Sequence, residues 1–136
     1  MTKQIDFSKY AIFVDGVTSD SSKDYKSFLD SIEYLDGEGS NIHRLLTAAV
    51  GISAEGGEFM EIVKKMVFQG KPYNDENREH LIIELGDVMW YVMQACKALD
   101  VSIEEVVAGN VDKLKKRYPG GEFDVHYSEN RAANDR

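Results

Sequence analysis

The stretch L-I-I-E-L-G-D-V-M-W-Y-V-M, residues 81–93, is apolar except for one glycine and two acids, Glu84 and Asp87. Positions three apart lie on one face of a helix, so this spacing points both carboxylates in one direction. A second pair with the same spacing, Glu55 and Glu58, lies in A-E-G-G-E-F-M-E at residues 54–61. Burying an uncompensated carboxylate costs on the order of several kcal/mol. Four acids that face a core therefore predict a cation between them.

Hard oxygen ligands without a histidine or thiolate pattern favour magnesium or manganese over zinc. His80 and His126 are expected to be isolated and form no zinc-binding arrangement. The alternative is that the acids lie on solvated helix faces and pair with lysines. That alternative is open for Glu61, because Lys64 and Lys65 follow it by three and four residues.

The length and charge of the chain limit what it can be. A chain of 136 residues predicts one domain, residues 1–136, for which oligomerisation would add stability. The 24 acids exceed the 16 bases, giving a formal net charge of -8, which argues against a nucleic-acid binder. The single cysteine, Cys96, excludes an internal disulfide, and its apolar surroundings predict a core thiol. No apolar run is long enough for a signal peptide or a membrane anchor, so we expect a cytoplasmic protein without a membrane partner.

The hydrophobic periodicity predicts an all-α fold, a bundle of four to five helices with an irregular, polar C-terminal arm at residues 119–136. The core of the bundle is expected at about residues 22–118. Serines near residue 22, Asn74 or Asp75, and Ser102 are expected to begin helices, and Ser102 and Glu105 form a capping-box pattern. The expected helices are residues 7–17, 22–35, 40–68, 74–99 and 102–118.

Three segments together carry a family resemblance: A-A-V-G-I-S-A-E-G-G-E-F-M-E-I-V-K-K at residues 48–65, E-L-G-D-V-M-W-Y-V at 84–92 and N-V-D-K-L-K-K-R-Y-P-G-G-E-F-D at 110–124. They resemble the E-x-x-E and E-x-x-D signature of the all-α NTP pyrophosphatases, and most of all its MazG-like branch. Phage-encoded MazG-like proteins are small and single-domain like this one, which is compatible with a viral origin.

The resemblance implies hydrolysis of a nucleoside or deoxynucleoside triphosphate between the α and β phosphates, which yields the monophosphate and pyrophosphate. It also implies that Glu55, Glu58, Glu84 and Asp87 hold Mg²⁺, with Mn²⁺ as a substitute. Glu58 is the carboxylate that we expect to act as general base on the attacking water. Many MazG relatives carry a further acid where this chain has Ala54, so the number of bound ions stays open.

Cations and aromatic residues provide candidates for binding the substrate. Asn110, Lys113 and Arg117 lie along one helical stripe suited to a phosphate chain, although cations near a helix C-terminus also complement its dipole. Lys65 is a weaker phosphate candidate. Aromatic side chains that could stack on the base include Trp90 and Tyr118, although most aromatics at helical spacing belong to a core.

Two readings other than an enzyme remain open. One is a helical module that binds a nucleotide or an alarmone such as ppGpp without turnover, and the other is an acidic adaptor for a partner protein. A P-loop NTPase and a serine hydrolase are excluded, because neither motif occurs. For the enzyme we expect a homodimer or homotetramer, with the active site near the subunit contact.

Overall fold

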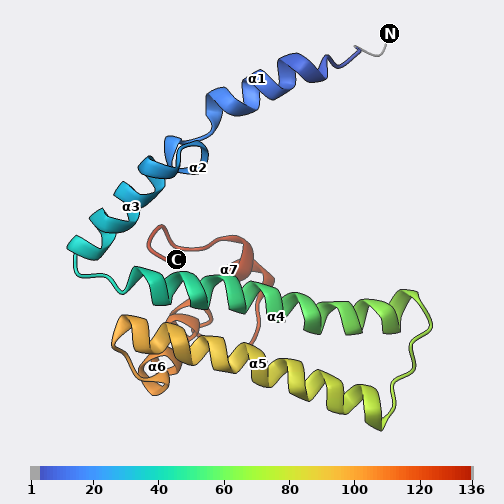
Figure 1. Ribbon diagram of the computed structural model, residues 1–136. Helices are drawn as coiled ribbons and strands as arrows, with labels where there is room; N and C mark the ends of the chain where they lie inside the picture. The colour runs from blue at the N-terminus through green and yellow to red at the C-terminus, as the bar shows by residue number, and fades with distance from the viewer. Residues whose placement is uncertain (1–3, 136) are drawn as a thin grey trace. The chain divides into compact units, whose positions relative to one another are not determined.

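A computed structural model describes residues 4–135 of the chain. Every regular element among these residues is a helix, so the predicted all-α fold is confirmed (Figure 1). The chain divides into two compact units, Met1–Ile42 and His43–Arg136. The helices are α1 (Phe7–Val17), α2 (Asp20–Lys23), α3 (Tyr25–Gly37), α4 (Ile42–Phe68), α5 (Asp75–Leu99), α6 (Ile103–Arg117) and α7 (Val125–Glu129).

The first unit holds α1, α2 and α3. Helix α1 has the predicted bounds and is capped by the side chain of Asp6. The prediction of one helix over residues 22–35 was wrong, because the chain turns at Asp24 and divides the segment into α2 and α3. The carboxylate of Asp24, rather than a serine hydroxyl, caps α3 by accepting a hydrogen bond from the backbone N–H of Ser27 at 2.8 Å. Aspartate and serine are equally good N-caps, so the expected kind of cap is present but is provided by Asp24 instead of a serine.

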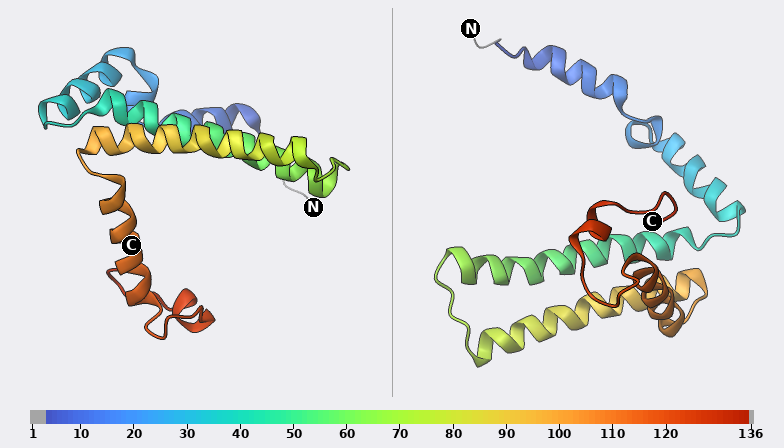
Figure 2. Two further views of the ribbon diagram at one scale, coloured as in Figure 1. Left: turned by 90° about the horizontal axis from the view of Figure 1, so that it is seen from below. Right: turned by 180° about the vertical axis from the view of Figure 1, so that it is seen from behind.

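In the second unit α4 and α5 run antiparallel as a hairpin, which the views in Figure 2 show from two further sides. The Arg44 Nε donates a hydrogen bond to Gln94 Oε1 at 2.9 Å and joins the two helices near one end. The Tyr91 ring covers Gly51, where an added Cβ would overlap the ring. Glycine is needed here because any side chain would force α4 and Tyr91 apart.

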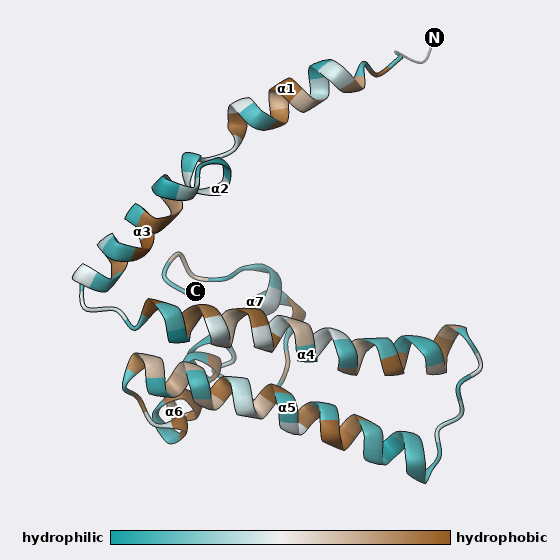
Figure 3. Ribbon diagram, viewed as in Figure 1, coloured by the Kyte–Doolittle hydropathy of each residue, from teal (hydrophilic) through white to brown (hydrophobic). Residues whose placement is uncertain are grey.

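Few side chains of this hairpin are buried in the single chain. Ala48, Ile62 and Cys96 are 2%, 5% and 3% exposed, which confirms Cys96 as a core thiol. Figure 3 shows further apolar residues along both helices. Large apolar side chains that stay exposed on α4 and α5 are Leu46, Val50, Ile52, Met60, Val63, Val67, Phe68, Ile82, Ile83, Leu85, Met89, Trp90, Met93 and Leu99.

The predicted beginnings of α5 and α6 are confirmed at atomic detail. The Asn74 side chain accepts a hydrogen bond from the backbone N–H of Asn77 at 2.9 Å and caps α5. Ser102 and Glu105 form both hydrogen bonds of the capping box that begins α6. The expectation of an irregular arm was wrong in one part, because Val125–Glu129 forms the short helix α7, capped by Asp124. No helix in the described part of the chain is long and apolar enough to cross a membrane.

Candidate functional site

Three carboxylates meet between the two helices of the hairpin. Glu55 comes from α4, and Glu84 and Asp87 come from successive turns of α5. One oxygen of each lies within 4.8 Å of the others. Glu55 and Glu84 are half-buried and Asp87 is exposed, so the acids face one another across the hairpin rather than a closed core. We call these three residues the carboxylate cluster.

The negative charges of the carboxylate cluster and its own desolvation both act on Glu55. Desolvation, together with the negative charges of Asp87, Glu84 and Glu58, raises the pKa of Glu55 above its ordinary value. A raised pKa means that desolvation and the neighbouring negative charges disfavour the ionised form of Glu55. Hard oxygen donors that repel one another are a suitable ligand set for a divalent cation such as Mg²⁺.

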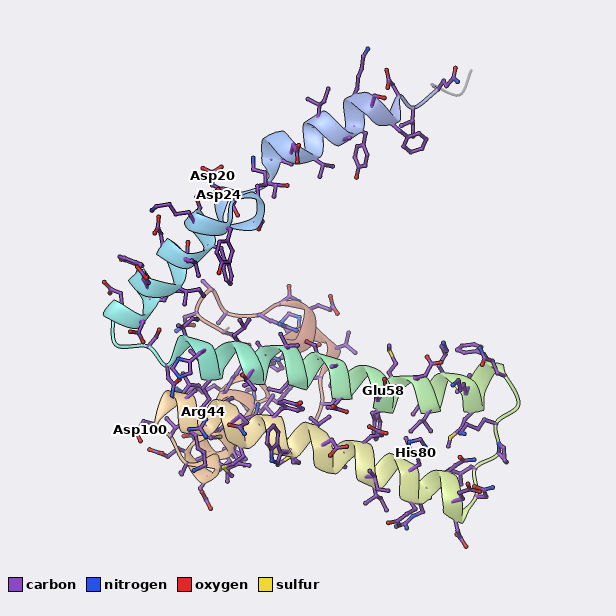
Figure 4. The ribbon with its side chains drawn as sticks, viewed as in Figure 1. Asp20, Asp24, Arg44, Glu58, His80 and Asp100 are labelled. Atoms are coloured by element: carbon purple, nitrogen blue, oxygen red, sulfur yellow. The ribbon has the colours of Figure 1, made fainter. Side chains whose placement is uncertain are left out.

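Glu58, the fourth predicted ligand, lies outside this close set of three oxygens. It is exposed on α4, one turn after Glu55, and acts on Glu55 through its charge. Figure 4 labels Glu58 on α4 and His80 on α5. Two glycines, Gly56 and Gly57, separate Glu55 from Glu58, and an added Cβ at either would meet nothing within 4 Å. The predicted acids therefore divide into three that converge and one that stays beside them.

His80 was missed as a neighbour of the site, and the expectation that it stands alone was wrong. Its Nε2 lies 2.9 Å from Oε1 of Glu84, one helical turn away on α5. The spacing of four residues was visible in the sequence and predicts this pairing. The histidine fixes the direction of the Glu84 carboxylate that also belongs to the carboxylate cluster.

Lys65 pairs with Glu61 rather than with the carboxylate cluster. The Nζ atoms of Lys64 and Lys65 lie 2.7 Å and 3.4 Å from the two oxygens of Glu61. Hydrogen bonds from Lys64, and the charges of both lysines, lower the pKa of Glu61. The solvated lysine pairing considered for Glu61 from its sequence spacing is thus confirmed.

The predicted basic stripe lies on α6, with its last member held by the C-terminal arm. Lys113 and Arg117 line a cavity of about 550 Å³ between α6 and the arm, whereas Asn110 is not among the lining residues. The guanidinium of Arg117 donates two hydrogen bonds to Asp135, from Nε at 2.6 Å and from Nη2 at 2.7 Å. Asp135 was not predicted, because no local spacing connects it with Arg117 across the turn and α7.

The two predicted stacking residues differ in their surroundings. Trp90 is 56% exposed on α5, with its ring edge-on to Tyr91 at a centroid distance of 4.8 Å. Tyr118 directly follows α6 and packs at a tilt against Phe123, with 5.8 Å between centroids. An exposed indole offers a free face to a planar ligand.

A helical hairpin with clustered carboxylates, followed by a helix that carries cations, is an arrangement suited to an all-α enzyme that acts on phosphorylated substrates. The model of the MazG nucleotide pyrophosphohydrolase domain matches residues 44–121, more than half of the chain, and the chain belongs to this family. Members of the family generally depend on a divalent metal.

A relative supports the family assignment. The gene 37 protein of Mycobacterium phage L5 is 38% identical over 86 residues, which cover 62% of this chain and 75% of that protein. A phage relative is consistent with the viral origin with which the family resemblance is compatible. No solved structure matches this chain.

Proposed function

We propose that this protein hydrolyses nucleoside or deoxynucleoside triphosphates at the α,β-phosphate bond and releases the monophosphate and pyrophosphate. The observation that carries the proposal is the carboxylate cluster, in which three acids converge from two helices. Such a set is costly to maintain unless a cation binds there. The family supplies the nature of the reaction.

The ligand set fits Mg²⁺, and Mn²⁺ as a substitute. Glu55, Glu84 and Asp87 would hold the ion, and Glu58, the fourth expected ligand, would act on this set through its charge. The ion, when bound, would polarise a phosphoryl oxygen and lower the pKa of a water molecule. The contact from His80 would hold Glu84 in a fixed direction.

Other side chains would bind the substrate and handle the proton. Glu58, outside the close set, would accept the proton of the attacking water as general base. Asn110, Lys113 and Arg117 on α6 would contact the phosphates, with Lys65 a weaker candidate because Glu61 already pairs with it. The exposed face of Trp90, and the ring of Tyr118, would stack on the base.

The test is a panel of standard NTPs and dNTPs incubated with the protein and magnesium. We expect pyrophosphate from at least one of them, and loss of turnover when the metal is chelated. Orthophosphate in place of pyrophosphate would move the cleaved bond to the terminal phosphate and contradict the proposal.

Variants of the carboxylate cluster test the ligand assignment. Glu84→Gln and Asp87→Asn should abolish pyrophosphate release while the circular dichroism spectrum stays helical. The matched control is Glu79→Gln, which removes an exposed acid from the same helix, and should leave turnover unchanged. Retained turnover in either cluster variant contradicts the metal-ligand assignment.

A nucleotide- or alarmone-binding module without turnover is the second candidate. The exposed Trp90 and the cations of α6 suit binding alone. Binding of a nucleotide such as ppGpp without any product from the panel would favour this candidate over the enzyme.

We also propose that the protein is a homodimer or homotetramer. Exposed apolar side chains occur along both α4 and α5, and extensive exposed apolar surface is a usual mark of a protein interface. A second copy covering this face would bring its own residues near the carboxylate cluster. Sedimentation analysis tests this proposal, and a monomer at micromolar concentration would contradict it. For a viral protein the expected location is the cytoplasm of the host.

A further inference from the structure

The C-terminal arm brings an acid to the basic stripe of α6. The cavity between α6 and the arm, about 550 Å³, has a size typical of small-ligand sites. Four cations and two acids line it, a difference of two positive charges in a chain whose net charge is -8. The cations are Lys113, Lys116, Arg117 and Arg131, and the acids are Asp112 and Asp135.

Asp135 binds Arg117 in the way that a phosphate does. Its two oxygens accept from Nε and Nη2 of one guanidinium, and both side chains are 12% exposed. Arginine recognises carboxylate and phosphate with the same planar fork of donors. An anion of the substrate and the carboxylate of Asp135 would therefore occupy the same donors, and only one of them can do so at a time.

The surrounding charges also favour an anion at this position. The hydrogen bonds from Arg117, and the charges of Arg117, Lys113 and Arg131, lower the pKa of Asp135. The same pairing raises the pKa of Arg117. Lys113 on α6 and Arg131 in the arm line the same cavity and act on the carboxylate through their charges, so three cations favour an anion at this position.

We propose that this cavity binds a phosphate group of the substrate and that Asp135 is a built-in competitor for it. The identity of the ligand as a nucleotide phosphate rests on the proposed function. With the arm closed, Arg117 is satisfied by Asp135, and a phosphate binds only after the carboxylate leaves. The apparent affinity for the phosphate is the intrinsic affinity multiplied by the fraction of molecules in which Asp135 has left Arg117.

Inorganic pyrophosphate is the probe, in the absence of divalent metal and nucleotide, with binding measured by titration calorimetry on the full chain. We compare the wild type with Asp135→Asn and with Glu129→Gln, a control that removes one exposed negative charge from the same arm. Since exposed ion pairs are weak and this one is partly shielded, we expect Asp135→Asn to lower Kd about three- to tenfold. The control should change Kd by less than about twofold, because long-range charge is screened.

Equal affinities in Asp135→Asn and the control overturn the proposal, since the ion pair would then only fasten the arm. Weaker binding by Asp135→Asn also overturns it, because Asp135 would then be holding Arg117 in place for the ligand. Circular dichroism of both variants shows whether the overall helix content is retained, and Arg117→Lys should bind pyrophosphate more weakly in the Asp135→Asn background.

This outcome is separate from that of the proposed function. Tighter pyrophosphate binding by Asp135→Asn, without hydrolysis of any nucleotide, supports the role of Asp135 as a competitor and contradicts the proposed hydrolysis. Hydrolysis of nucleotides, with equal pyrophosphate affinities in the two variants, supports the proposed function and contradicts the role of Asp135 as a competitor. For an active enzyme, Asp135→Asn should lower KM and leave kcat unchanged.

Discussion

The contact between Gly51 and Tyr91 makes a quantitative prediction about the α4–α5 hairpin. A Cβ at Gly51 would overlap Cγ, Cδ1 and Cε1 of the Tyr91 ring. Because Cγ lies close to the backbone, the ring cannot escape by a small motion of its tip, and either its rotamer or the helix spacing must change. Overpacking of this kind costs about 3 kcal/mol at the upper end of its usual range. Alanine recovers about 1 kcal/mol of helix propensity, so Gly51→Ala should lower the free energy of unfolding by about 2 kcal/mol.

Gly56→Ala is the matched control on the same helix. Its Cβ would meet nothing within 4 Å, so only the helix-propensity gain of up to about 1 kcal/mol should remain. The assay is urea unfolding followed by circular dichroism, without magnesium and at one protein concentration for all variants. A subunit contact would make stability depend on concentration, and a fixed concentration removes that effect from the comparison.

A double-mutant cycle identifies the partner of the added methyl group. In the Gly51→Ala background, Tyr91→Ala should cost less than it does in the wild type, because it also removes the overlap. Stabilisation of Gly51→Ala equal to that of Gly56→Ala would refute the close contact. Equal costs of Tyr91→Ala in both backgrounds would show that the strain lies elsewhere.

Three further predictions concern the carboxylate cluster and the beginning of α6. Asp87→Asn should make the metal-free protein more stable than the wild type at neutral pH, because the charge of Asp87 raises the pKa of Glu55. This gain in stability should shrink as the pH falls through the pKa of Glu55, because protonated Glu55 is no longer repelled. Urea unfolding at several pH values measures the difference. Magnesium at ten times its Kd should stabilise the wild type by about 1.4 kcal/mol and Asp87→Asn by much less. Thermal unfolding with and without the ion measures this difference. Equal stabilisation of both proteins would mean that the ion binds elsewhere. Ser102→Ala should cost about 1 kcal/mol, since the hydroxyl accepts from Glu105 N–H at 3.1 Å, and an unchanged urea midpoint would contradict this role.

Local signals in the sequence predicted much of the second unit. The side chains of Asn74 and Ser102 cap the helices that they were expected to begin. Helix α4 ends at Phe68 and α5 at Leu99, as the periodicity indicated. These features depend on residues within one helical turn of one another, which is why a single sequence carries them.

Features that depend on distant parts of the chain were harder to predict. The turn at Asp24 and the helix α7 are short, and short helices have little periodicity to read. The pairing of Arg117 with Asp135 spans 18 residues and depends on how the arm folds. The separation of Glu58 from the carboxylate cluster depends on how α4 and α5 face one another, which spacing along one helix does not contain.

The repulsion within the carboxylate cluster has a consequence for how such a protein diverges. Substituting one of its acids removes one of the proposed metal ligands and, by the same change, relieves a repulsion in the metal-free fold. A descendant that loses activity in this way would not be eliminated for misfolding and could accumulate as a sturdier protein. Its α6 cations would be untouched by that change. Under the proposed function, selection for turnover would preserve the three acids, and a lineage freed from it would have a direct route to a binder that no longer cleaves.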